Sequence, residues 1–366
     1  VENKDLDDQV LLKRDGLPHW KGWLIRVAAV VLALILSGAF IYAITRLNPV
    51  QVYEAMFEGA FGSSRRSWVT IRDAMMLLCI GIGLAPAFKM KFWNIGAEGQ
   101  ILVGGCMTAG LMLALGGTVP TPVLLVIMAI ASLCAGAVWG MIPAVFKARW
   151  GTNETLFTLM MNYVAIQITS YCVALWENPY GSNVVGIINQ STKDGWFPEL
   201  FGQAYGLNVL IVVVLTVGMY IYLKSSKQGY EIAVVGESQN TARYAGIRLS
   251  KVFIRTMAIS GAICGLAGFI AVAGASHTIS TSTAGGRGFT AIIVAWLAQF
   301  NTFVMVLISF LLVFLQKGAS QIASQFKLNE FASNVITGII LFCIIGSEFF
   351  IQYKLIFRGR KEAHHS

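Results

Sequence analysis

The most constraining feature of the chain is a series of apolar runs, each close to the length of a bilayer crossing. A membrane-spanning helix needs about 20 predominantly apolar residues, and such runs recur along the 366 residues. Only 12% of the residues are charged and the mean hydropathy is +0.68, whereas soluble domains average about 25% charged residues. The sequence therefore predicts an all-α polytopic membrane protein with a helix bundle as its core.

We expect about ten transmembrane segments, and the range is eight to ten because two segments are short enough to be broken or re-entrant half-helices. The short segments are 73–88 and 286–300, and the second follows a Gly/Ser/Thr-rich stretch at 274–288. The other expected segments are 27–45, 100–116, 120–147, 155–176, 207–224, 252–274, 302–318 and 333–351. Residues 27–351 thus form one predicted transmembrane domain.

Lysines and arginines cluster at the ends of the apolar segments, a distribution that orients membrane proteins and gives no nucleic-acid footprint. With the N-terminus inside, nineteen of the 27 cations fall on the cytoplasmic side and eight outside. This asymmetry predicts cytoplasmic tails at 1–26 and 352–366, with a retained first helix instead of a cleavable signal. It places loop 177–206 outside and loop 225–251 inside. Four arginines in 46–72 fall outside, where a surface amphipathic helix or a local topology error would explain them.

A polar stretch, Asn94-Ile95-Gly96-Ala97-Glu98-Gly99-Gln100, interrupts the apolar sequence between two expected helices. Lipid tolerates such a loop only where protein or a watery cavity covers it. Polar breaks at membrane depth usually belong to a transport path. A short broken segment precedes a longer one in both 73–116 and 274–318, which hints that two halves of the chain contribute to one path.

The sequence shows no recognisable catalytic or energy-coupling motif. It lacks the G-x-x-x-x-G-K-[ST] phosphate loop, the HExxH motif and any Cys/His cluster, so we expect no ATPase activity, cofactor or metal site in this chain. The six cysteines lie in apolar segments, which predicts buried free thiols and no disulfide. His277 stands alone in an apolar region, where a scaffold role is more common than a catalytic one.

Amides and carboxylates near the polar break are the candidate contacts for a polar solute. They are Asn94, Glu98, Gln100, Asn153, Glu154 and Asn162. Asn153 or Glu154 shares a helix face with Asn162 because they are eight or nine residues apart. Two alternatives stay open: the groups satisfy one another and the backbone of the loop, and Asn153 with Glu154 completes a helix N-terminus.

The inner loop predicts a short amphipathic helix over 237–246, with Gly246 at its C-terminal cap. The small Ala242 allows another surface to approach closely, and Arg243 adds charge nearby. A docking helix for a cytoplasmic partner and a solvated loop are both consistent with this stretch.

Three motifs together resemble the permease subunits of bacterial ABC importers, in the branch of branched-chain amino acid and ribose permeases. Phe92 to Gln100 is similar to the family signature F-N-I-G-x-E-G-Q, with Trp93 as an insertion. Asn153-Glu154-Thr155-Leu156 with Met160-Met161-Asn162-Tyr163 resembles N-E-x-[IL]-x-x-[LM]-M-x-N-Y. Residues 236–247 resemble the coupling loop E-A-A-x-x-x-G, although the usual Leu-Pro is absent. The likeness covers roughly 50–350 and is closest to nucleoside and simple-sugar permeases.

The resemblance implies a non-catalytic permease in the bacterial cell membrane that forms the path for nucleosides or simple sugars. Its implied partners are a cytoplasmic ATPase with two nucleotide sites, which carries ATP and Mg²⁺, a second related permease in a heterodimer, and an extracellular binding lipoprotein. The implied ATPase contacts are Glu237, Thr241, Ala242, Arg243 and Gly246. The alternative is an ion-gradient-driven secondary transporter of a small polar solute, although the few acids at membrane depth make a thin set for a proton relay.

Overall fold

The computed structural model describes residues 9–13, 19–46, 48–200 and 202–327, with isolated positions between 335 and 357. The chain divides into two compact units. The larger is Trp68–Val313, and the smaller joins Val1–Ser67 to Phe314–Ser366.

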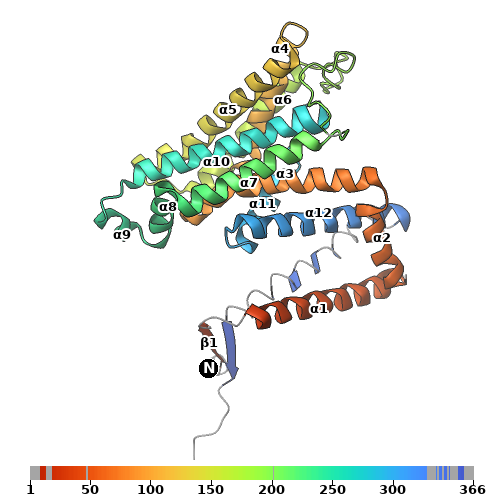
Figure 1. Cartoon of the computed structure of the whole chain (residues 1–366), viewed down its shortest axis with the longest axis vertical. Coiled ribbons are helices and arrows are strands. Elements are labelled where there is room, and N and C mark those ends of the chain that lie inside the picture. Colours follow the sequence, from red (N-terminus) through yellow and green to blue (C-terminus); the bar gives the residue numbers. More distant parts are fainter. Residues whose placement is uncertain are drawn as a thin grey trace, which may run out of the picture. The chain divides into compact units, whose positions relative to one another are not determined.

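The larger unit is helical (Figure 1). Its elements in chain order are α3 (Ser64–Lys89), α4 (Ala97–Leu115), α5 (Thr121–Trp150), α6 (Glu154–Leu175), α7 (Gly206–Ser225), α8 (Lys227–Glu237), α9 (Gln239–Tyr244), α10 (Leu249–Ala271), the π-helical turn η1 (Val272–Ser276), α11 (Arg287–Leu297) and the first half of α12 (Thr302–Gln325). Helices α8 and α9 lie at one end of α7 and α10, and the 177–205 loop lies at the other end (Figure 1).

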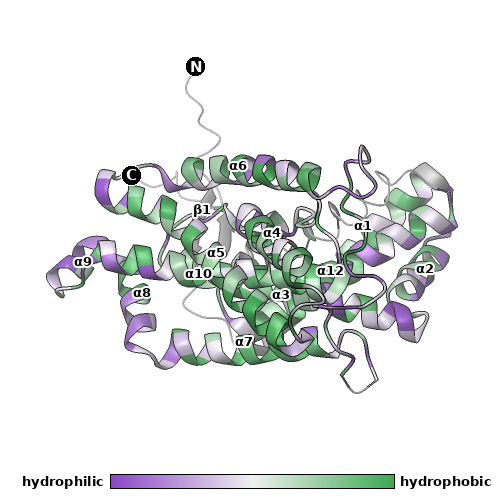
Figure 2. Ribbon diagram, turned by 90° about the horizontal axis from the view of Figure 1, so that it is seen from above, coloured by the Kyte–Doolittle hydropathy of each residue, from purple (hydrophilic) through white to green (hydrophobic). Residues whose placement is uncertain are grey.

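Helices α4, α5 and α10 pack around glycines, and α3 is buried along most of its length. Most of α3 is hydrophobic (Figure 2). A Cβ at Gly136 of α5 would lie 2.2 Å from the carbonyl oxygen of Gly261 in α10, and a Cβ at Gly104 of α4 would lie 2.3 Å from that of Gly265. Small residues at such crossings let membrane helices approach backbone to backbone, which maximises van der Waals contact where lipid offers no hydrophobic drive.

The smaller unit contains α1 (His19–Thr45) and α2 (Pro49–Phe61), followed by the first turn of α3. Asn48 caps α2 by accepting a hydrogen bond from the backbone N–H of Val50 at 3.0 Å, and the Phe61 ring stacks on Phe314 at 6.0 Å. Strand β1 (Gln9–Lys13) pairs antiparallel with β2 (Tyr353–Phe357). The sequence pattern gave no signal for this pair, which lies within the expected terminal tails.

Seven described helices are long and apolar enough to cross a bilayer: α3, α4, α5, α6, α7, α10 with η1, and α12. One expectation needs correction: the segment predicted at 73–88 as a possible half-helix belongs to the 26-residue α3. The stretch 46–72, for which a surface helix or a topology error was considered, contains α2 and the start of α3, and Arg65, Arg66 and Arg72 lie in α3. The expected segment 333–351 falls mostly outside the described residues.

Helix α11 occupies the position of the second expected half-helix. It has 11 residues, which at 1.5 Å per residue is about 16 Å, roughly half of the hydrocarbon thickness. A helix of this length leaves its N-terminal N–H groups inside the protein, where they need acceptors.

Candidate functional site

A buried asparagine holds the loop that joins α3 to α4, residues 90–96. Asn94 Oδ1 accepts hydrogen bonds from the backbone N–H of Gly96 at 3.0 Å and from Gln100 Nε2 at 3.3 Å. Its Nδ2 donates to Ser260 Oγ on α10 at 3.1 Å. Asn94 is 0% exposed, so these bonds replace the water that a polar loop would otherwise require.

Helix α6 braces the same loop from another side. Asn162 Oδ1 accepts from the backbone N–H of Gly99 at 2.8 Å, and Asn162 Nδ2 donates to the carbonyl of Ile95 at 2.9 Å. One turn earlier, Thr158 Oγ1 accepts from the backbone N–H of Ile95 at 3.2 Å. Asn162 thereby satisfies one free N–H in the first turn of α4 and one carbonyl of the loop, as buried backbone at a break in a membrane helix requires.

Glu98 joins the N-terminus of α4 to the N-terminus of the short helix α11. One carboxylate oxygen, Oε1, accepts from the backbone N–H of Gly286 at 2.6 Å, and Oε2 accepts from that of Gly288 at 2.8 Å. These groups form the N-terminus of α11, and Glu98 itself lies in the first turn of α4. A buried carboxylate thus sits at the positive ends of two helix dipoles. A Cβ at Gly288 would lie 2.6 Å from Glu98 Oε2, so this approach requires glycine.

Asn153 and Glu154 lie apart from this cluster, at the corner between α5 and α6. Asn153 Oδ1 caps α6 by accepting from the backbone N–H groups of Thr155 and Leu156. The Glu154 carboxylate pairs with Lys147 Nζ at 2.7 Å. Of the six predicted candidates, the structure therefore gathers Asn94, Glu98, Gln100 and Asn162, and it places Asn153 and Glu154 elsewhere.

An ionic cluster around the buried Asp73 of α3 was not predicted from the sequence. Asp73 Oδ1 pairs with the Arg72 guanidinium at 2.8 Å and with Arg287 of α11 at 3.8 Å. Arg72 also donates to the Tyr205 hydroxyl at 3.2 Å. The residues come from three distant parts of the sequence, so no local spacing pointed to them.

Aromatic rings connect the loop to α11. The Trp93 ring stacks on Trp296 with centroids 5.3 Å apart, and Phe88 meets both rings edge-on. Trp93 is the residue that departs from the family signature, and its ring thus packs where the loop and α11 meet.

The inner loop is mostly helical, and one sequence expectation there is corrected. The helix predicted over 237–246 is α9, which begins at Gln239 with Ser238 as its cap, while Glu237 belongs to the end of α8. Gly246 has φ +75° and follows α9 as predicted. Ala242 is buried, whereas Thr241 and Arg243 are exposed.

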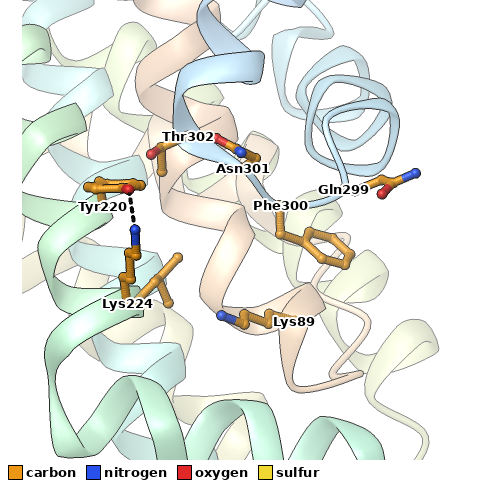
Figure 3. Close-up of a pocket in the computed structure, with 8 residues that line it drawn as sticks. Lys89, Tyr220, Lys224, Gln299, Phe300, Asn301 and Thr302 are labelled. Carbon is orange, nitrogen blue, oxygen red and sulfur yellow. Dashed lines mark hydrogen bonds between the residues drawn. The ribbon is translucent and has the colours of Figure 1, made fainter. Parts of the chain in front are cut away.

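A cavity of about 230 Å³ lies near the C-terminal end of α3 (Figure 3). Its lining includes Lys89, Lys224, Tyr220 and Thr302, the first residue of α12. Lys224 Nζ donates to the Tyr220 hydroxyl at 2.8 Å. Two ammonium groups beside a helix N-terminus make this cavity suited to a negatively charged group.

His277 lies in the loop that follows η1, with φ +53°. Its ring stacks on Trp196 at 3.7 Å, and its backbone carbonyl accepts from the N–H of Ile188 at 2.8 Å. Burial lowers the pKa of His277 below its ordinary value. In the described part of the chain, no set of three or more His, Cys, Asp or Glu side chains is placed to hold a metal ion.

Comparison with known proteins gives consistent matches. The family model described as "Branched-chain amino acid transport system / permease component" matches residues 69–345. The guanosine ABC transporter permease NupP of Bacillus subtilis is 31% identical over 91% of this chain and 95% of its own. The glucose ABC transporter permease TsgB13 of Haloferax volcanii is 28% identical over 93% of this chain and 92% of its own. The guanosine ABC transporter permease NupQ of Bacillus subtilis is 27% identical over 61% of this chain and 72% of its own. No solved structure matches the chain.

Proposed function

We propose a function from one premise: this chain belongs to the family described as the permease component of branched-chain amino acid transport systems. It is a permease subunit of an ABC importer, and its solute is a nucleoside or a related simple sugar. The observation that carries this assignment is the likeness over more than 90% of the chain to NupP and TsgB13, permeases named for guanosine and glucose transport.

The remaining machinery lies on other chains in this proposal. A cytoplasmic ATPase with two nucleotide sites carries ATP and Mg²⁺ and contacts α9 and its flanks. The proposed contact residues are Glu237, Thr241, Ala242, Arg243 and Gly246. The exposure of Thr241 and Arg243 at one end of the helices supports this surface. The positive-inside count supports a cytoplasmic location for that end and for both chain termini, in a protein of the bacterial cell membrane.

We propose a second, related permease as the partner in a heterodimer. Two different permeases of Bacillus subtilis, NupP and NupQ, carry the name of a guanosine ABC transporter, and both resemble this chain. An extracellular binding lipoprotein delivers the solute to the end that carries loop 177–206.

The six polar residues singled out from the sequence retain a proposed place along the path. Asn94, Gln100 and Asn162 hold the loop, and Glu98 fixes it to α11. Asn153 and Glu154 fix the corner at which α6 begins. Movement of α4 and α11 would open or close the path, because Glu98 makes them move together.

Uptake into vesicles tests the proposal. The chain is reconstituted with its ATPase and second permease, the binding protein is added outside, and ATP is trapped inside. Radiolabelled guanosine and glucose are offered separately with and without an uncoupler. ATP-dependent uptake that survives the uncoupler supports the importer, whereas uptake that needs no ATP and collapses with the ion gradient supports the secondary transporter.

A further inference from the structure

Helix α6 has two faces of different character. The face toward the loop buries Thr158, Asn162, Ala165, Thr169 and Val173. The opposite face exposes two tyrosines and an amide, Tyr163, Gln167 and Tyr171, and the tyrosines are 65% and 67% exposed. These three residues recur every fourth position and so form one stripe. None of their side chains makes a hydrogen bond within the described residues.

The stripe differs from the exposed faces of the neighbouring long helices. Among the described residues of α5, the exposed side chains between Val123 and Phe146 are apolar, and those of α7 between Leu210 and Ile221 are apolar too. Such faces suit lipid. Helix α6 also exposes apolar residues such as Leu156, Met160 and Leu175, but hydrophilic residues are interspersed along its length (Figure 2).

The position of Gln167 makes a lipid-facing role costly. It lies about 20 Å from the start of α6 and about 12 Å from its end at 1.5 Å per residue, so it sits well inside a span of 22 residues. An amide in hydrocarbon without a partner costs a few kcal/mol. Polar residues at this depth mark a water-filled path or a protein contact.

We propose that this face of α6 lines the solute path and that Tyr163, Gln167 and Tyr171 contact a nucleoside directly; this inference rests on the proposed function. The phenol rings offer flat surfaces on which a base can stack. The Gln167 amide has both a donor and an acceptor for a base edge or a ribose hydroxyl. The exposed residues of α6 carry no ionised side chain, so the face suits a neutral solute better than a zwitterionic amino acid.

The stripe is continuous with the braced loop through α6 itself. Asn162, which holds Gly99 and Ile95, is the immediate neighbour of Tyr163 in the sequence. A shift of the loop during the transport cycle would therefore move the backbone of the solute-contacting stripe. Solute contact is thus linked to α4 and, through Glu98, to α11.

Thiol labelling tests the location of the path without reference to a solute. Gln167→Cys and the matched control Val214→Cys, on the exposed face of α7, are made in a chain whose six native cysteines are replaced by serine or alanine. A charged, water-soluble thiol reagent is applied to the assembled transporter. We expect labelling of Gln167→Cys at least tenfold faster than of Val214→Cys, and protection by guanosine. Equal, slow labelling at both positions would overturn the inference.

Transport kinetics test the direct contact. Gln167→Leu should raise KM for guanosine by about tenfold, the effect of losing one buried hydrogen bond. Tyr163→Leu should lower guanosine uptake several-fold, because the base loses a ring on which it stacks. Val214→Leu should change neither. Wild-type kinetics in the α6 variants would contradict the proposal.

The outcomes separate this inference from the proposed function. A wild-type transporter without ATP-driven uptake of either guanosine or glucose would refute the proposed function, and fast labelling of Gln167→Cys would still place α6 on a watery path. A wild-type transporter that imports guanosine, with variants that lose the second permease on co-purification, would show that the stripe is a subunit contact and overturn the inference.

Discussion

At the scale of single residues, Glu98 has the most consequential position. Its carboxylate satisfies two backbone N–H groups at the N-terminus of α11, 188 and 190 residues away in the sequence. A charge-assisted bond of this kind is worth roughly twice a neutral one, and the bonds join the first turn of α4 to the short helix α11.

Replacement of Glu98 by alanine should destabilise the protein by about 3 kcal/mol, because two buried N–H groups lose a charged acceptor. Glu98→Gln keeps one acceptor oxygen and should cost less. Thermal unfolding in detergent measures both. Glu177→Ala is the matched control, since Glu177 also accepts from two backbone N–H groups but in an exposed loop. An equal loss in both alanine variants would contradict the bridging role.

The pKa of His277 gives a second prediction at this scale. Burial lowers that pKa from its ordinary 6.5, so the folded protein favours the neutral ring and the unfolded chain binds more protons at mildly acidic pH. The free energy of unfolding should therefore fall as the pH drops below about 6.5. Melting temperature as a function of pH checks this. His277→Asn, which tolerates the left-handed backbone, should flatten that part of the profile.

At the scale of elements, the helices were largely predictable and their contacts were not. Apolar runs predicted the positions of α4, α5, α6, α7 and α10, and Gly246 marked the end of α9, because these signals are local. The polar break at 94–100 was equally visible from its composition. Its partners were not, because Asn162 and Gly286 meet the loop through packing that no local spacing encodes. The 73–88 segment was underestimated because the arginines at 65, 66 and 72 concealed the start of α3.

The crossing of α5 and α10 offers a prediction about packing. Gly136→Val should destabilise the protein by several kcal/mol, because even a Cβ would lie 2.2 Å from the Gly261 carbonyl oxygen and the helices would have to separate. Gly218→Val on α7 is the control, since nothing lies within 4 Å of its Cβ position. Unfolding in detergent should show a large loss for the first variant and little change for the second.

At the scale of the whole molecule, the chain is an ABC transporter permease, and the proposed function requires it to receive force from an ATPase chain. Its α8 and α9 lie at one end of the helices and the 177–205 loop at the other (Figure 1). Gly236 of α8 packs directly on the Lys89 carbonyl at the end of α3. In the proposed mechanism, a push on α8 and α9 would reach α3 through this contact and, through the 90–96 loop and Glu98, α4 and α11.

Charge reversal on α9 should break this connection. Arg243→Glu should reduce ATPase-driven uptake at least tenfold while leaving the melting temperature of the permease unchanged, because Arg243 is exposed and lies outside the packed core. Arg65→Glu, an exposed charge reversal at the other end of α3, is the control. Co-purification with the ATPase and uptake in vesicles provide the two readings, and normal coupling in Arg243→Glu would exclude α9 as the contact.

The most direct test of the central claim is guanosine uptake by the reconstituted complex with ATP trapped inside the vesicles and the ion gradients abolished by an uncoupler. The account predicts accumulation that continues under these conditions and stops when ATP is replaced by a non-hydrolysable analogue. Accumulation that stops with the uncoupler, while ATP remains, would contradict it.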